Sequence, residues 1–292
     1  MPTTSTSTFP ANGGAPPRAT WLRQTWWPTP ALGATALLHA GGTAVLIYEP
    51  LAWPWIGGGL LANHALLTAA GFAPRSAMLG PNLTCLPRAA VDRGEVSLTF
   101  DDGPHPEVTP RVLDLLDAAG MKASFFLVGE QAARYPVLAR EIVERGHSVE
   151  NHSHRHSPWF AFCGTGRARR DIERAQRAIA DATGSAPLYF RAPFGIRSPL
   201  LEPALAACGL RYVSWTRRGF DTVDRDAAKV LDRLARGLAA GDVLLLHDGA
   251  ARYARIGDMG VLTTLRALLA RLAERGLRSV TLRAACADAQ SG

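Results

Sequence analysis

A regular alternation runs through the chain after residue 93 and limits the folds open to it. Seven short runs rich in β-branched or aromatic residues alternate with helix-length segments of mixed polarity, the pattern of βα units around a parallel sheet. The predicted strands are residues 96–100, 123–128, 147–151, 189–192, 211–215, 243–247 and 278–282. The predicted helices are residues 108–119, 131–145, 167–183, 199–208, 226–239 and 260–275. We therefore expect an α/β fold, a distorted (β/α) barrel of about seven parallel strands.

A glycine follows each of the six predicted helices, at the place where a left-handed residue commonly ends a helix. These glycines are Gly120, Gly146, Gly184, Gly209, Gly241 and Gly276. No fixed period recurs in the sequence, which excludes a repeat architecture. The helix ends therefore support the same βα reading as the strands.

The first quarter of the chain contains two long segments without charged residues. Residues 31–48 and 51–72 contain no charged side chain, and each run is about as long as a bilayer crossing. Trp27, Tyr48 and Trp55 lie near the ends of these runs, as aromatic residues do at a membrane interface. We predict a disordered tail over residues 1–25, a membrane anchor over 26–75, a linker over 76–94 and a globular domain over 95–285.

The anchor has three possible arrangements: a transmembrane helical hairpin, a single span, or an apolar segment that does not cross. We expect the hairpin. Arg23 precedes the first run and Arg75 follows the second, so the positive-inside tendency places both flanks of a hairpin in the cytoplasm. With one span the globular domain would lie on the external or periplasmic face. A cleaved signal peptide fits poorly because the polar lead is about 30 residues long.

The charge distribution limits the classes of binding partner, and the cysteine spacing indicates the state of the thiols. The formal net charge of +7 at pH 7 is not concentrated in one block, which favours an anionic membrane lipid surface and predicts no nucleic-acid partner. The four cysteines show no CxxC or other zinc spacing, so we expect free thiols.

Polar motifs follow several predicted strands, at the sheet edge where parallel α/β folds hold their active sites. Asp101 and Asp102 directly follow the first predicted strand, and one carboxylate can bind a metal while the other faces water. A turn built on Asp-Asp-Gly-Pro explains the pair equally well. His152 and His156 are four residues apart, so in a helical turn they would share a face and bind one ion.

A histidine ends the predicted strand 243–247. His247 follows four apolar residues and is either a satisfied core residue or a proton donor. Asp221 can orient its imidazole and keep it protonated. Arg191 is suited to fixing the ionised state of a nearby carboxylate.

Together these motifs, at residues 99–104, 152–156, 191–195 and 245–247, resemble those of the polysaccharide deacetylases, the NodB-homology group of carbohydrate esterase family 4 type. The resemblance spans about residues 96–282. It implies that Asp102, His152 and His156 hold one divalent metal ion, Zn²⁺ or else Co²⁺, Ni²⁺ or Mn²⁺.

The resemblance also implies the roles of the remaining site residues. Asp101 would be the general base, and His247 would protonate the leaving amine. The backbone N–H of Phe194 would help to stabilise the oxyanion. Arg191 would position Asp101, and Asp221 would support His247.

The fourth motif, residues 215–221, departs from the family pattern. The family usually carries a second Asp three residues before the one that Asp221 matches, and a Trp after it. Arg218 and Thr222 occupy those places here. We interpret the departures as a change of acceptor with catalysis retained.

The sequence therefore predicts a hydrolase: a metal-dependent deacetylase of the bacterial-type inner (cell) membrane, with a cytoplasmic catalytic domain. Its substrate would be an N-acetylated amino sugar in a polysaccharide or lipid-linked saccharide, so that its partners are an N-acylated saccharide or glycolipid and membrane lipid. The alternatives are a deformylase or O-acetyl esterase acting on a glycolipid, and a non-catalytic glycan-binding membrane protein.

Overall fold

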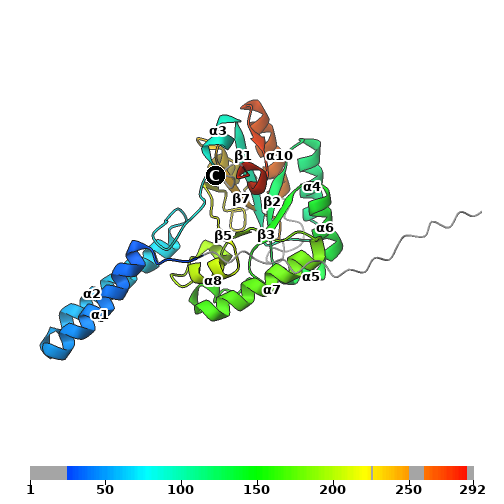
Figure 1. Cartoon of the computed structure of the whole chain (residues 1–292). Coiled ribbons are helices and arrows are strands. Elements are labelled where there is room, and N and C mark those ends of the chain that lie inside the picture. The colour runs from blue at the N-terminus through cyan, green and yellow to red at the C-terminus, as the bar shows by residue number, and fades with distance from the viewer. Residues whose placement is uncertain (1–24, 225, 250–259, 288–292) are drawn as a thin grey trace, which may run out of the picture.

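The computed structural model describes residues 25–224, 226–249 and 260–287 (Figure 1). The predicted disordered tail, residues 1–25, lies outside the described residues apart from its last one. The rest of the described chain consists of a curled α/β body and two long N-terminal helices that project from it.

A parallel sheet forms the centre of the body, with the strand order β5-β4-β3-β2-β1-β7-β6 and β8 paired to the start of β1. The strands are β1 (Glu95–Asp101), β2 (Ala123–Leu127), β3 (Ser148–Asn151), β4 (Tyr189–Phe190), β5 (Arg211–Tyr212), β6 (Arg217–Arg218), β7 (Val243–His247) and β8 (Arg278–Ser279). The two end strands of this path, β5 and β6, do not pair with each other within the described chain. The prediction of a parallel α/β fold is confirmed, and the sheet is a curled half-barrel.

Helices surround the sheet: most cover its outer face, whereas those that carry Ala90 and Leu282 pack with Phe126 of the inner face. The helices are α3 (Arg88–Asp92), α4 (Thr109–Ala118), α5 (Gly129–Arg134), α6 (Pro136–Glu144), α7 (Thr165–Thr183), α8 (Glu202–Ala207), α9 (Ala227–Ala235), α10 (Gly260–Glu274) and α11 (Leu282–Ala285), with the short 3₁₀ turns η2 (Phe160–Phe162) and η3 (Pro193–Gly195). The predicted helix 131–145 is in fact two helices, because Pro136 has no N–H to continue α5. The six glycines expected at helix ends all have positive φ.

Alternation along β1 assigns its side chains to two faces. Leu98 and Phe100 belong to the main apolar core, which also receives α4, α6, α9 and α10. Thr99 and Asp101 contact Arg191 on the opposite, inner face. The strand that builds the core therefore also presents a carboxylate inside the half-barrel.

The N-terminal helices α1 (Pro30–Tyr48) and α2 (Trp53–Phe72) are joined by the 3₁₀ turn η1 (Pro50–Ala52) and lie side by side (Figure 1). Polar side chains meet between them: Thr35 with Asn63, and His39 with His64 at 3.3 Å between Nε2 atoms. Among the described helices, α1 alone has the length and apolar character of a membrane span. Composition therefore supports the first predicted span and not the second.

The end of α2 is docked on the body. The backbone N–H of Arg197 donates to the carbonyl of Gly71 at 3.0 Å, and a side chain at Gly71 would strike the Arg197 carbonyl. The Arg197 guanidinium donates to the carbonyls of Gly80 and Pro81 and pairs with Glu202. Arg197 therefore joins the last turn of α2 and the chain after it to the segment that follows η3.

Candidate active site

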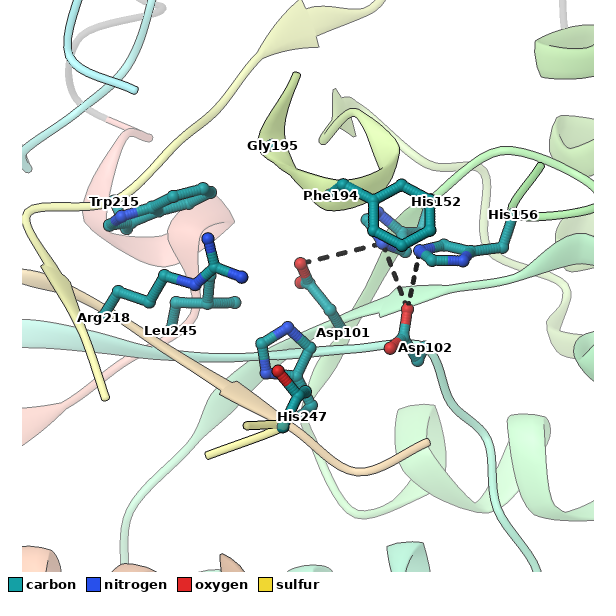
Figure 2. A pocket seen from close by; sticks show the side chains of 11 residues that line it. Asp101, Asp102, His152, His156, Phe194, Gly195, Trp215, Arg218, Leu245 and His247 are labelled. Carbon is teal, nitrogen blue, oxygen red and sulfur yellow. Dashed lines mark ion pairs between the residues drawn. The ribbon is translucent and has the colours of Figure 1, made fainter. Parts of the chain in front are cut away.

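A pocket opens at the C-terminal ends of β1 and β7 (Figure 2). Charged and aromatic side chains from five separate segments line it: Asp101, Asp102, His152, His156, Phe194, Gly195, Trp215, Arg218, Thr222, Leu245 and His247. Arg191 and Asp221 lie directly behind this lining, bonded to Asp101 and His247. The structure thus brings together all of the predicted site residues.

Three of these residues form a compact buried cluster. Oδ1 of Asp102 lies 3.3 Å from Nε2 of His152 and 3.1 Å from Nε2 of His156 (Figure 2). One ligand atom from each residue lies within 4.8 Å of the others. Burial alone would raise the pKa of Asp102, but the adjoining histidines, His152 foremost, hold that pKa well below its usual range. The cluster therefore offers one carboxylate and two imidazoles to a single point.

The two histidines converge in a way that differs from the predicted helical turn. Residues 152–156 form an irregular loop in which Ser153 and His156 have positive φ. The loop is held by hydrogen bonds from Ser153 N–H to Asn151 Oδ1 and from His156 N–H to Ser153 Oγ. The i, i+4 helical argument was wrong, because left-handed residues and not helix geometry bring the rings together.

The ligand atoms of the cluster are of the kind that bind a cation. Nδ1 of His152 donates to the Arg191 carbonyl at 2.9 Å, so Nε2 is the ring nitrogen left to bind an ion beside Asp102. Oδ1 of Asp102 is buried and accepts no hydrogen bond from any described residue. A carboxylate oxygen and an imidazole nitrogen 3.3 Å apart need a proton or a cation between them. One carboxylate and two imidazoles match the donors that zinc takes in catalytic sites, with positions left open.

Asp101 is held beside this cluster by a fully buried arginine. Nη1 of Arg191 donates to Oδ1 of Asp101 at 2.7 Å and to Thr99 Oγ1 at 2.9 Å, and Nη2 donates to the Ser214 carbonyl at 2.8 Å. Its guanidinium also stacks on Phe126, 4.1 Å from the ring centroid. Oδ2 of Asp101 lies 3.8 Å from Nε2 of His152. One oxygen is therefore fixed by Arg191 while the other faces the cluster.

His247 faces the same pocket from the end of β7. Its Nδ1 donates to Oδ1 of Asp221 at 2.9 Å, and its backbone N–H donates to Oδ2 at 2.8 Å. Burial alone would lower the pKa of His247, but the carboxylates around it, Asp221 foremost and then Asp102 and Asp101, outweigh burial and raise the pKa to about 9. The imidazole is therefore protonated at neutral pH, with Nε2 available to a substrate.

The turn η3 forms another part of the wall. Phe194 has φ 60° and its ring lies 4.7 Å from that of His156. At Gly195, a Cβ atom would come within 2.3 Å of the Trp215 ring. Only glycine permits this approach, so the turn is pressed against the aromatic wall beside the cluster.

One buried acid was missed by the sequence reasoning. Asp248 follows His247 directly and accepts a hydrogen bond from Thr109 Oγ1 at 2.5 Å. Burial raises the pKa of Asp248 to about 7. Gly103 leaves room for this carboxyl, since a Cβ atom there would lie 2.4 Å from it. The adjacency to His247 was the available signal, and the contact places Asp248 beneath the turn that carries Asp102.

The chain is similar in sequence to several known proteins. The model of the family described as polysaccharide deacetylase matches residues 88–213. A chitooligosaccharide deacetylase of Sinorhizobium fredii is 38% identical over 172 residues, covering 57% of this chain and 78% of that protein. The peptidoglycan-N-acetylglucosamine deacetylase PgdA of Listeria monocytogenes is 33% identical over 163 residues, 56% of this chain and 34% of PgdA.

Solved structures agree with the sequence relatives. The family 4 carbohydrate esterase from Streptomyces lividans, in complex with acetate, superimposes with a TM-score of 0.58 at 34% identity. The match covers 64% of this chain and 91% of the esterase.

Proposed function

The chain belongs to the polysaccharide deacetylase family, and from that membership we propose that it hydrolyses the N-acetyl group of an amino sugar, in a polysaccharide or a lipid-linked saccharide, with the help of a divalent metal ion. The observation that carries the proposal is that one pocket holds three groups of residues suited to amide hydrolysis. These are the Asp-His-His cluster, a carboxylate fixed by a buried arginine, and a histidine kept protonated by an aspartate.

The expected ion is Zn²⁺, and its ligands would be Asp102, His152 and His156. When bound, such an ion acts as a Lewis acid on the acyl carbonyl and makes water a stronger acid. The backbone N–H of Phe194 would donate to the oxyanion as it develops. Phe194 lines the pocket and is half exposed, so it is accessible to a bound substrate.

Proton transfer is assigned to two side chains beside the cluster, Asp101 and His247, which are paired in register at the ends of β1 and β7. Oδ2 of Asp101 takes a proton from the attacking water, because Oδ1 is occupied by Arg191. Nε2 of His247 then gives its proton to the leaving nitrogen as the C–N bond breaks. The products are acetate and a free amine.

The direct test is hydrolysis of an N-acetylated chito-oligosaccharide by the purified full-length chain, with acetate and primary amine both quantified. We expect equal amounts of the two products, loss of activity after chelation, and recovery on adding Zn²⁺. Release of neither product from any N-acetylated saccharide, with the metal present, would contradict the proposal. A formyl or O-acetyl substrate in the same assay tests the deformylase and esterase alternatives.

We also propose that α1 and α2 insert together as a membrane anchor, with residues 76–94 linking them to a catalytic domain over 95–285. The interhelical contacts Thr35 to Asn63 and His39 to His64 support this, because paired polar groups cost less in lipid than unpaired ones. A hairpin returns the chain to its starting side, so the flanking arginines favour a cytoplasmic domain and a lipid-linked substrate.

Topology can be measured with reporters fused after Gly292. A signal from a reporter active only in the cytoplasm agrees with the hairpin. A signal from one active only outside the cytoplasm means that α1 spans alone, and it would point to wall or exported glycan as substrate.

A further inference from the structure

Arg218 places a positive charge in the wall of the pocket. It ends β6, where it is paired in register with Leu245 of β7, and both residues line the pocket (Figure 2). His247 lies two residues further along β7. The guanidinium therefore lies on the side of the pocket from which His247 faces the substrate.

Two aromatic rings clamp this guanidinium. Its central carbon lies 5.2 Å from the centroid of the Trp215 ring and 4.8 Å from that of Phe220. Trp215 is buried, while Phe220 has φ 60° and is half exposed. Stacking occupies the faces of a guanidinium and leaves its N–H edge free for a planar or tetrahedral acceptor.

The N–H groups of Arg218 lack acceptors in the part of the chain that the structure describes. Its Nε is buried without a hydrogen-bond partner there, and no described carboxylate oxygen lies within 4.0 Å of the guanidinium. The preceding residue, Arg217, differs: it pairs with Asp242 and donates to the carbonyls of Arg236 and Gly237. An arginine held rigid with unmet donors is arranged to receive an anion from outside.

We propose that Arg218 binds an anionic group of the substrate, a carboxylate or a phosphate, next to the N-acetyl group that is hydrolysed. This inference rests on the proposed function. Arg218 therefore sets the substrate class as an acidic amino-sugar glycan. The Thr222 hydroxyl lines the same pocket and is a second donor to that group.

Three matched substrates separate the sources of the anion: a neutral chito-oligosaccharide, one of equal length whose neighbouring sugar bears a carboxylate, and an N-acetylglucosamine carrying a phosphate. For the anionic substrate that fits, we expect wild-type kcat/KM to exceed the neutral value by about 10- to 100-fold, as one charge-assisted contact provides. Arg218→Gln should remove that preference mainly through KM, so that the anionic and neutral substrates are hydrolysed with similar kcat/KM.

Arg236→Gln is the matched control, because it removes the same charge from a side chain that is 77% exposed. It should change none of the three rates. Equal wild-type rates on all three substrates would overturn the inference, and so would an equal loss on all three in Arg218→Gln. If only the carboxylate or only the phosphate is favoured, the source is identified.

Binding gives a readout without turnover. Calorimetric titration of the Asp101→Asn protein with each anionic saccharide should show weaker binding, by a similar factor, when Arg218→Gln is added. If no saccharide is hydrolysed, the proposed function fails while this comparison still decides the anion site. Unchanged affinity on adding Arg218→Gln would refute it.

Discussion

Replacing Asp221 with asparagine separates the charge of that side chain from its shape. Asp221 accepts two hydrogen bonds from His247 and raises the pKa of the imidazole to about 9 from an ordinary value of 6.5. One pKa unit corresponds to 1.36 kcal/mol, so Asp221 and its neighbours stabilise the imidazolium by about 3 kcal/mol net of burial. Asparagine can still accept from the backbone N–H but carries no charge. In Asp221→Asn the pKa of His247 should fall below 6.5.

The consequence is a change in the pH profile. A general acid must be protonated, so wild-type kcat/KM should fall as pH rises through the pKa of His247, about 9 before the field of a bound metal ion is added. In the variant the same fall should come below about pH 6.5, which at pH 8 lowers the rate by about 30-fold through proton occupancy alone. A dication at the neighbouring cluster repels the imidazolium and moves both limbs to lower pH, leaving their separation.

The assay is kcat/KM for N-acetyl hydrolysis measured from pH 5 to 10. The control is Asp224→Asn, which removes the same charge from an aspartate that pairs with Arg233 outside the pocket. That variant should keep the wild-type profile. An alkaline limb that stays in place in Asp221→Asn would refute the assignment of His247 as the acid.

Three further changes test other parts of the site and fold. Asp101→Asn should lower turnover by about 10²- to 10⁴-fold while metal content by elemental analysis stays at the wild-type level; unchanged turnover would remove Asp101 from the base role. His156→Ala should lose bound metal and activity together, and a normal metal content would exclude it as a ligand. Burial beside Lys122 lowers the pKa of His147 to about 4, below the unfolded value, so the unfolded chain binds more protons between these values. The free energy of unfolding, measured with urea, should therefore fall by about 2 to 3 kcal/mol between pH 7 and pH 4.5, and His147→Asn should show a smaller fall.

The main strands and helices of the α/β body could be predicted from sequence periodicity, because each of them has a local sequence pattern. A strand such as β7 is a run of apolar residues, and a helix such as α7 is amphipathic and ends at a left-handed Gly184. Strand β6 was not predicted, since Arg217 and Arg218 have no strand pattern and pair only because β7 lies beside them. Short elements of this kind are decided by tertiary contacts.

The site was less accessible to sequence reasoning. The rule that parallel strands carry polar side chains at their C-terminal ends located Asp101 and His247, but the contact between Asp101 and Arg191 joins residues 90 apart. Its role came from family resemblance. The stacking of Arg218 between Trp215 and Phe220 depends on loop conformation, including a left-handed Phe220, that no local pattern encodes.

The docking of α2 bears on how this protein can be handled. A chain cut after Phe72 to remove the helices would lose the Gly71 carbonyl that receives the Arg197 N–H, two residues beyond Gly195 in the pocket wall. It would also uncover Leu79, which is buried against Leu67 and Ala70 at the base of α2. The last turn of α2 is thus a piece of the catalytic body, and a fragment prepared without it is a different molecule at the substrate-facing turn.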